Sequence, residues 1–423
     1  MYIPKYTAGN IYDCFKRNNR KKTNLAQFLD ITNMRKVFYL VLSLVIASCT
    51  SNKELQEKLA FIDVTKEYPE KKIELTDIAD VSYLYLNSKN DDYLYKGSID
   101  YVTENNIIVI DRSQNSVLFF SKEGNPKSHF NRRGQGSEEY RDAYSVMYDE
   151  ANDEVFVSPD FSDHIMVYSS LGEFKRKINL PQTNVNGQMA LFDDVSILVY
   201  DNTKLWKSIM QSNAPGIVQT IDSAFFLISK LDGTVLDYIS LPNKNIDLSY
   251  KDLNSVFTGQ VSYGRVRKSA DGLLLYNPES DTVFHYSKEK HLTPYMHKKP
   301  ILSSQTSMTV MDICMDAGKY QFIAVYPYRE TAKSPTPKYY MRNKATGELF
   351  RPKITLSDFE GKELYINPRL LNYYEHAYHF ELDFAELEEA YYKNKLSGKL
   401  KEQVASLLED EESNNVFVFA DFY

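Results

Sequence analysis

The chain has 423 residues, of which 43% are hydrophobic, 13% aromatic and 25% charged, and its formal net charge at pH 7 is −7. An acidic surface of this kind repels the phosphate backbone of nucleic acids, which argues against a nucleic-acid function. The three cysteines, Cys14, Cys49 and Cys314, leave only one free thiol in the mature chain predicted below, so no disulfide or cysteine metal cluster forms within it.

A bacterial lipoprotein signal lies well inside the chain, at residues 34–49. Arg35 and Lys36 form a short basic region, and an apolar run follows to Val45. The last four residues, Ile-Ala-Ser-Cys49, have the small-residue pattern that lipoprotein signal peptidase cuts before a lipid-modified cysteine. The apolar run is far shorter than the roughly 20 residues that a membrane-spanning helix needs. We therefore predict a lipidated cysteine and not a transmembrane anchor.

This signal sets the expected start of the mature protein. The predicted signal peptide covers 34–48, and residues 1–33 are interpreted as a mis-assigned extension, with Met34 as the initiator. Cleavage before Cys49 removes eight basic and two acidic residues from the totals of 50 and 57, which leaves a net charge of −13. Attachment to a membrane would then depend on acyl chains, because no basic patch is available. Residues 49–70 are predicted to form a lipidated tether.

From residue 72 onward, short β-like runs alternate with turn signals, and helical periodicity is nearly absent before residue 380. The clearest unit has a strand at 107–111, a tight turn, a strand at 116–121 and a turn that ends at Gly124. Related units follow at 154–172, 224–233, 272–290 and 320–347. Self-similarity at roughly 45–60 residues, with several strands in each unit, is the signature of β-propeller blades.

The predicted fold class is all-β, a six-bladed β-propeller over residues 71–423, because about 350 residues hold about six blades at this spacing. A ring must be closed, since free edges of the first and last blades would template aggregation. The final strand, at 415–422, is expected to complete a blade that begins near 72–75. A short helical insertion at about 383–409, interrupted near Ser397-Gly398, precedes this closing strand.

Two segments resemble a known family. Residues 73–81, followed by Tyr83-Leu84-Tyr85-Leu86, resemble the opening strands of the 6-bladed β-propeller lipoproteins of the Bacteroidota, which are related to NHL-repeat propellers. The Gly-rich turn at 130–140, which ends in Glu-Tyr, resembles the first-blade hallmark of that family, although Ser137 stands where the family usually has Pro. The resemblance covers residues 72–422 and implies the fold. It implies no particular reaction or ligand.

The same Gly-rich turn holds the candidate ligand contacts. Its segment Arg133-Gly134-Gln135-Gly136 lacks the third glycine and the Lys-Ser/Thr pair of phosphate-binding loops, so we interpret it as a turn that connects blades. Such a turn lies on a loop face of the propeller, where binding residues concentrate. Arg132, Arg133, Glu138 and Tyr140 are therefore the predicted ligand contacts.

Two metal sites are weighed against simpler interpretations. Four polar residues fall at the ends of predicted blade strands, namely Asp111, Asp160, Asn277 and Asp281. They would converge on a central channel as calcium ligands, but Asp and Asn also cap tight turns, which is the preferred interpretation. His376 and His379 are three apart and would share a metal on a helical turn, but no third ligand is evident. Cys314 is interpreted as a small buried hydrophobe.

The sequence thus predicts a lipoprotein of the outer membrane whose monomeric propeller is a non-catalytic binding or scaffold module. Its expected ligand is a glycan, a peptide or an envelope protein. Exposed tyrosines beside acidic residues suit carbohydrate or peptide contacts. One alternative is a propeller enzyme, a lyase or hydrolase that uses a channel metal. Another is an accessory subunit of an uptake or sensing complex. The periplasmic and the surface-exposed sides of the membrane both stay open.

Overall fold

The computed structural model describes eleven segments of the chain, namely residues 59–88, 92–159, 162–184, 189–200, 225–241, 266–277, 280–300, 309–327, 337–365, 377–408 and 414–423. From Ala60 onward they belong to one compact unit, Ala60–Tyr423. The predicted extension, signal peptide and lipidated Cys49 lie outside the described residues. Within these segments, no helix is both long and apolar enough to cross a membrane.

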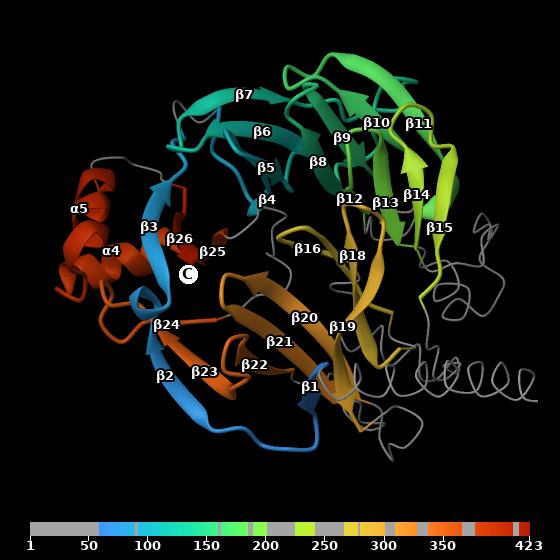
Figure 1. The fold of residues 1–423 in the computed structure, drawn as a ribbon. Coiled ribbons are helices and arrows are strands. Elements are labelled where there is room, and N and C mark those ends of the chain that lie inside the picture. Colours follow the sequence, from blue (N-terminus) through green and yellow to red (C-terminus); the bar gives the residue numbers. More distant parts are fainter. Residues whose placement is uncertain are drawn as a thin grey trace, which may run out of the picture. The chain divides into compact units, whose positions relative to one another are not determined.

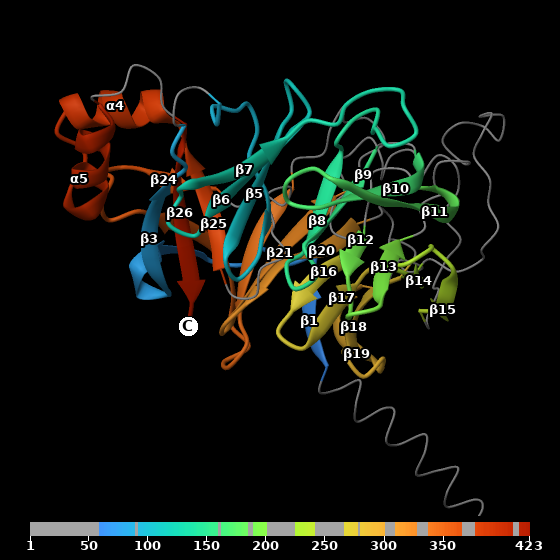
Figure 2. The same ribbon diagram turned by 90° about the horizontal axis from the view of Figure 1, so that it is seen from above.

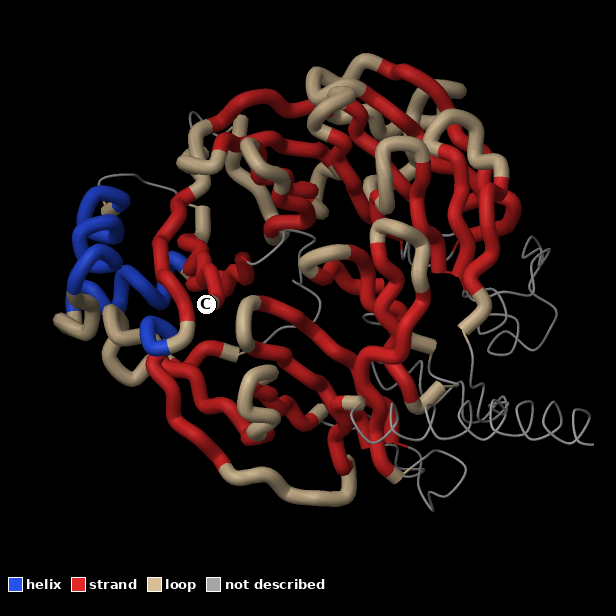
Figure 3. The backbone as a smooth tube through the Cα atoms, viewed as in Figure 1, coloured by secondary structure: helices blue, strands red, loops and turns tan. Residues whose placement is uncertain are grey.

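The unit is a six-bladed β-propeller whose strands form six sheets arranged in a ring (Figures 1 and 3). The first three blades are four-stranded antiparallel meanders. Blade 1 contains β4 (Ile99–Val102), β5 (Asn106–Asp111), β6 (Ser116–Ser121) and β7 (Pro126–Phe130). Blade 2 contains β8 (Ser145–Asp149), β9 (Glu154–Ser158), β10 (Ser162–Tyr168) and β11 (Phe174–Asn184). Blade 3 contains β12 (Met189–Leu191), β13 (Ser196–Tyr200), β14 (Phe225–Ser229) and β15 (Val235–Ile239).

The remaining three blades also take strands from the N-terminal part of the chain. Blade 4 contains β16 (Val266–Ser269), β17 (Gly272–Leu275), β18 (Thr282–Ser287) and β19 (Leu292–Lys299). Blade 5 contains β20 (Thr309–Ala317), β21 (Tyr320–Pro327), β22 (Lys338–Asn343), β23 (Leu349–Thr355) and the short β24 (Glu363–Leu364). Blade 6 contains β25 (Ala377–Leu382), β26 (Val416–Phe422) and β3 (Ala79–Tyr85).

Residues 60–85, which we call the N-terminal strap, run along the outside of three consecutive blades (Figure 1). The first strand, β1 (Ala60–Asp63), pairs in parallel with β19 of blade 4. The second, β2 (Glu70–Glu74), pairs in parallel with β23 of blade 5. After the 3₁₀ helix η1 (Leu75–Asp77), β3 pairs antiparallel with β26 in blade 6. One continuous segment therefore joins three blades from outside.

The prediction that the two ends of the chain share one blade is confirmed, because β26 and β3 pair along their whole length. The predicted N-terminal partner, residues 72–75, is wrong. That segment lies in β2 and η1, where Lys71 and Lys72 are exposed and Ile73 is buried. Such a strand can cover a sheet edge, whereas β26 is a central strand that needs partners on both sides.

The propeller also begins earlier than residue 71, so the predicted tether at 49–70 is too long. Ile62 in β1 is completely buried within the main hydrophobic core, although its neighbour Phe61 is exposed. A four-residue strand with a single fully buried side chain carries too little periodicity to be recognised from sequence. Only its pairing with β19 shows that it belongs to blade 4.

The predicted helical insertion is confirmed as two helices between β25 and β26. They are α4 (Phe384–Tyr392) and α5 (Gly398–Leu407), and the predicted interruption at Ser397-Gly398 is the start of α5. Leu387 on α4 and Leu400 on α5 are completely buried in the same core as blades 4 to 6. The helices lie on the outside of blade 6, beside β3 (Figure 1).

The glycine turns that marked the repeats are contacts between neighbouring blades. Gly124 has φ +83°, and a Cβ there would lie 2.0 Å from the carbonyl oxygen of Tyr85 in blade 6. Gly233 has φ +81°, and a Cβ there would lie 2.0 Å from the carbonyl oxygen of Asn179 in blade 2. Both turns need a residue without a side chain, because each touches the backbone of the preceding blade.

The ring has two faces, because consecutive antiparallel hairpins turn at opposite ends of a sheet. The hairpin face carries the turns between first and second strands, such as 103–105 in blade 1 and 150–153 in blade 2. The loop face carries the turns between second and third strands, such as 112–115, and the connections between blades, such as 131–144. Lys319 N, in the β20–β21 turn, donates to the carbonyl oxygen of Tyr423, so the C-terminus lies at the hairpin face (Figure 2).

Substitution of Ile62 by Ala tests whether the strap stabilises the propeller. Because Ile62 is fully buried, we expect the free energy of unfolding to fall by about 2–5 kcal/mol in urea titrations. Lys66→Ala is the matched control, since the Lys66 side chain in the same strap is 66% exposed and should change it by less than about 0.5 kcal/mol. Equal midpoints for wild type and Ile62→Ala would show that β1 does not stabilise the ring.

Candidate functional site

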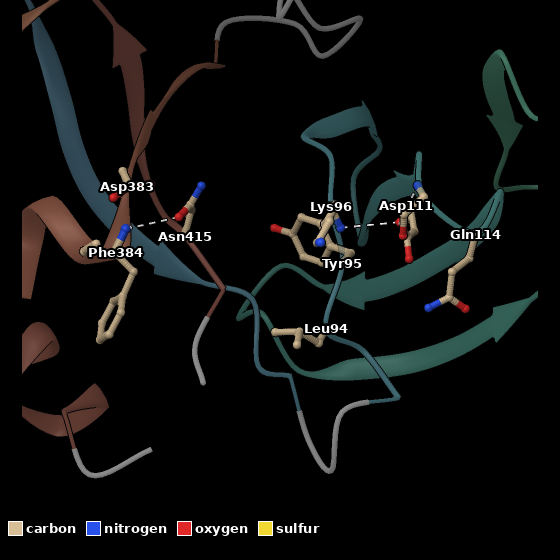
Figure 4. A pocket seen from close by; sticks show the side chains of 10 residues that line it. Leu94, Tyr95, Lys96, Asp111, Gln114, Asp383, Phe384 and Asn415 are labelled. Carbon is tan, nitrogen blue, oxygen red and sulfur yellow. Dashed lines mark hydrogen bonds between the residues drawn. The ribbon is translucent and has the colours of Figure 1, made fainter. Parts of the chain in front are cut away.

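A pocket of about 470 Å³ lies on the loop face, where blade 6 meets blade 1 (Figure 4). We call it the closure pocket, because it lies beside the blade that closes the ring. Its lining residues come from the segment before β4, the β5–β6 turn, the start of α4 and the residue before β26. They are Leu94, Tyr95, Lys96, Asp111, Ser113, Gln114, Asp383, Phe384, Ala385 and Asn415.

The blade 1 side of the closure pocket is shaped by Asp111 at the end of β5. One of its carboxylate oxygens accepts hydrogen bonds from the backbone N and the hydroxyl of Ser113, at 2.8 and 2.7 Å. The same oxygen lies 3.4 Å from the donating backbone N of Lys96. This is the turn-capping role that the sequence favoured for Asp111. It fixes the β5–β6 turn and leaves Gln114 exposed at the pocket rim.

The blade 6 side is shaped by the N-terminus of α4. Asp383 is the N-cap residue, and its side chain accepts a 3.0 Å hydrogen bond from the backbone N of Glu386. The Asn415 carboxamide accepts from the backbone N of Phe384 at 3.1 Å and donates to Glu381 at 2.8 Å. Asp383, which precedes α4, and Asn415, which precedes β26, thus fix the position of this rim.

Asn414 connects the two sides. It is 4% exposed, and its Nδ2 donates to the backbone oxygens of Leu86 and Tyr93 at 2.7 and 3.1 Å. Its Oδ1 accepts from the backbone N of Tyr95 at 3.4 Å. The segment that leads into blade 1 is therefore attached to the residues that precede β26, which determines where Tyr95 lies.

Tyr95 is the least satisfied polar group of the pocket. Its phenol packs edge-on against Phe120 with ring centroids 6.2 Å apart, and its hydroxyl oxygen is buried. Among the described residues this hydroxyl has no hydrogen-bond partner, and it points across the pocket toward the Asn415 side (Figure 4). Burial, and to a lesser degree the charge of Glu381, raises the pKa of Tyr95 well above its usual value. The hydroxyl is therefore a neutral donor and acceptor.

The pocket is suited to hydrogen bonding rather than to acid–base chemistry. Its two carboxylates, Asp111 and Asp383, already cap a turn and a helix. Its lining contains no histidine or cysteine, and its one cation is the exposed Lys96. Glu381 lies behind the rim, and burial raises its pKa. The hydrogen bond that Asn415 donates to Glu381 lowers this pKa, but burial has the larger effect.

The loop that holds the sequence-predicted contacts lies next to this pocket, on the same face. Tyr140 is completely buried, and its hydroxyl donates to the backbone oxygen of Asn115 at 2.7 Å and accepts from Arg132 N at 3.1 Å. It therefore stabilises the loop from inside and presents no group to a ligand. Asn131 Nδ2 donates to the Gln114 carbonyl oxygen at 2.9 Å, so loop and pocket share the β5–β6 turn.

The other three predicted contacts are exposed on the loop face. Arg132 Nε donates to the backbone oxygen of Gly172 in blade 2 at 2.7 Å. The backbone oxygen of Glu138 accepts from the Tyr168 hydroxyl at 2.9 Å, which leaves the carboxylate at the surface. Arg133 lies between them in a loop that joins β7 to β8, as the interpretation of a blade-connecting turn requires. Sequence reasoning considered Tyr95 only as one of a cluster of tyrosines and gave Asn415 no role in a site, because the two residues come from segments more than 300 positions apart.

A second pocket, of about 570 Å³, opens on the hairpin face. Turns of blades 1, 2 and 3 supply five carboxylates, Glu104, Asp149, Glu150, Asp193 and Asp194, beside Lys230 and Lys268. Lys230 and Asp149 form a buried ion pair at 2.8 Å. Asp193 accepts from the Ser196 hydroxyl at 2.6 Å and from the backbone N of Val195 at 3.0 Å. Asp149 and Asp193 therefore have structural partners.

No group of three or more His, Cys, Asp or Glu side chains able to hold a metal occurs in the part of the chain that the structure describes. Asp281 forms a buried ion pair with Lys298, and Asp160 and His376 lie outside the described residues. The calcium site therefore stays a prediction. His379 lies in strand β25 and not on a helical turn, and its ring contacts those of Phe417 and Phe419. Cys314 is buried, as expected.

Comparisons with known proteins match the fold. The model of a family described as a domain of unknown function, DUF4934, matches residues 59–421. The structure of an exported protein from Bacteroides fragilis is 14% identical with a TM-score of 0.56, and covers 84% of this chain and 99% of that protein. A member of the DUF4221 family from Bacteroides vulgatus is 11% identical with a TM-score of 0.43, and covers 82% of this chain and 97% of that protein.

More distant matches include an enzyme. Virginiamycin B lyase from Staphylococcus aureus is 13% identical with a TM-score of 0.33, and covers 71% of this chain and 81% of the lyase. No curated protein matches the chain. At these identities the resemblance to solved structures shows the propeller fold alone.

His379 predicts a pH dependence of stability. Burial lowers the pKa of His379 from 6.5 to about 4, so between these values the unfolded chain takes up a proton that the folded chain does not. The free energy of unfolding should therefore fall as the pH drops from 6.5 to 4, by up to about 3 kcal/mol from this group. In urea titrations, His379→Phe should remove that contribution, whereas His129→Gln, at an exposed position on β7, should keep the wild-type profile. Identical profiles for His379→Phe and wild type would contradict this assignment.

Proposed function

This chain belongs to the DUF4934 family, and from that premise we propose that it is a cell-envelope lipoprotein whose propeller is a non-catalytic binding module with the closure pocket as its ligand site. The observation that carries the proposal is the Tyr95 hydroxyl, which is buried, points into the pocket and has no partner among the described residues. A buried polar group in this state costs stability, and a ligand that supplies the missing hydrogen bond offsets the cost.

The lining favours a glycan as the ligand. Gln114 and Lys96 present a carboxamide and an ammonium group at the blade 1 rim, and Phe384 offers an aromatic ring at the blade 6 rim. Sugar hydroxyls both donate and accept, so they match a mixture of phenol, carboxamide and carboxylate groups, while an apolar sugar face stacks on an aromatic ring. A peptide or a protein partner offers fewer hydroxyl groups for the same volume.

Two observations support the cell envelope as the location. The residues Ile-Ala-Ser-Cys49 complete a lipoprotein signal, and Ala60 begins the propeller only a short distance beyond it. The protein of similar fold from Bacteroides fragilis is also named as an exported protein. A lipid at Cys49 would hold the propeller at the outer membrane.

Replacing Tyr95 by Phe separates binding from stability. Removing a buried hydroxyl without a partner should leave the stability of the free protein unchanged or raise it by about 1 kcal/mol, and should weaken glycan binding about 3- to 10-fold. A glycan array followed by titration calorimetry on the soluble chain with Cys49→Ser measures the affinity. Tyr93→Phe is the control, because Tyr93 packs on Phe120 but does not line the pocket. Binding that Tyr95→Phe leaves unchanged would refute this site.

Lipidation is tested with two cysteine substitutions. We expect wild type and Cys14→Ser to fractionate with membranes, and Cys49→Ser to appear in the soluble fraction, because the predicted acyl group is attached only at Cys49. Intact-mass spectrometry of the membrane form should show a mature chain that starts at Cys49 and carries acyl groups. Membrane retention of Cys49→Ser would contradict the anchor.

A further inference from the structure

We infer that the hairpin face of the propeller lies against the membrane, where exposed aliphatic turn tips contact lipid, so that the closure pocket opens away from the membrane. The conclusion rests on the lipid anchor of the proposed function. It adds an orientation, a lipid-contacting surface and a direction from which the ligand must arrive.

The first observation is the direction in which the chain joins the ring. Because β1 pairs in parallel with β19, Ala60 points toward the end of the blade at which β19 begins. That end holds the β18–β19 turn, where Lys288 N donates to the backbone oxygen of Asp271 in the β16–β17 turn at 3.0 Å. Turns between first and second strands define the hairpin face. The chain therefore reaches the propeller from this face, where β1 is also seen in Figure 2.

The second observation is the short distance in sequence between anchor and ring. Only residues 50–59 separate Cys49 from Ala60. Such a segment spans at most roughly 40 Å when fully extended. It is nearer 20 Å when relaxed. A tether of this length keeps the face from which it leaves close to the bilayer, and it would have to pass around the blades before the loop face could turn toward the lipid.

The third observation is the distribution of exposed leucines. The turns between third and fourth strands are closed by equivalent hydrogen bonds in blades 1 to 4, and the residue at the tip is Glu123, Leu171, Leu231 and Glu289 in turn. Leu171 is 68% exposed and Leu231 is 73% exposed. Since the same turn forms with Glu in blades 1 and 4, folding does not require a leucine there.

A third aliphatic side chain lies beside them. Val195, in the β12–β13 turn, is 63% exposed, and its backbone oxygen accepts from Lys230 N at 2.9 Å, next to Leu231. Single exposed aliphatic residues are normal on any surface. Here three occupy turn tips of neighbouring blades 2 and 3. The Leu171 turn is attached to the hairpin-face turn at 150–153, because Ser170 N donates to Asp153 Oδ1 at 3.0 Å, and on its outer side Gly172 O accepts from Arg132 of the neighbouring loop. The acidic pocket of the hairpin face would repel anionic headgroups, so the expected surface is zwitterionic lipid.

Tryptophan quenching by brominated lipid tests the orientation. The mature chain from Cys49 is coupled through that thiol to a maleimide lipid in phosphatidylcholine vesicles, since Cys314 is buried and unreactive. The single native tryptophan is removed by Trp206→Phe. A new one is introduced at a turn tip, by Leu171→Trp or Leu231→Trp, or on the loop face, by Gln135→Trp as the matched exposed control.

We expect loss of emission for the tryptophans at 171 and 231 and no loss at 135. Quenching at 135 that equals or exceeds quenching at the turn tips would overturn the orientation, and so would unquenched emission at both turn tips. Because the anchor is attached chemically, the outcome is independent of natural lipidation. A failure of this inference is therefore distinguishable from a failure of the proposed anchor or of glycan binding.

Discussion

Backbone pairing between β26 and β3 is the constraint on which the rest of the structure depends. It joins Val416 to Tyr85 and Phe422 to Ala79, residues more than 330 positions apart, in one antiparallel ladder. Without it, β26 would present an open edge in the middle of blade 6, and blade 1 would have no neighbour on that side. The N-terminal strap protects two more sheet edges in the same way, since β1 and β2 pair with the outer strands of blades 4 and 5.

The candidate site follows from this closure. Asn414 and Asn415 immediately precede β26, and they hydrogen-bond the segment before β4 and the first turn of α4. The pocket exists because the closing strand, the helical insertion and blade 1 meet at one place. Ligand binding there would add contacts across the junction at which the ring is completed, so occupancy and ring stability should be coupled.

Much of the fold was predictable because it repeats. Alternating strands and glycine turns recur in each blade, since every blade must present the same two faces to its neighbours, and turns such as that at Gly124 touch the backbone of the blade before. The helical insertion was predictable from its periodicity. By contrast, β1 was missed, because an edge strand with one fully buried side chain, Ile62, has almost no periodic signal. The segment that forms β3 was read as part of the opening strands, but its pairing with β26 is a long-range contact that no local pattern shows. The candidate site was recovered only in part. The Gly-rich turn predicted ligand contacts in the loop at 131–140, but Tyr140 in this loop is completely buried.

The sequence by itself determined the number of blades, the helical insertion and the capping role of Asp111, since each depends on neighbours within a few residues or on a regular spacing. Only the tertiary structure decided that Tyr95, Phe384 and Asn415 share a pocket, that the strap crosses three blades, and that the chain reaches the ring from the hairpin face. These features depend on which distant strands pair and in which direction. Pairing of that kind is set by the closure of the ring and by burial against other blades, and no local pattern encodes it.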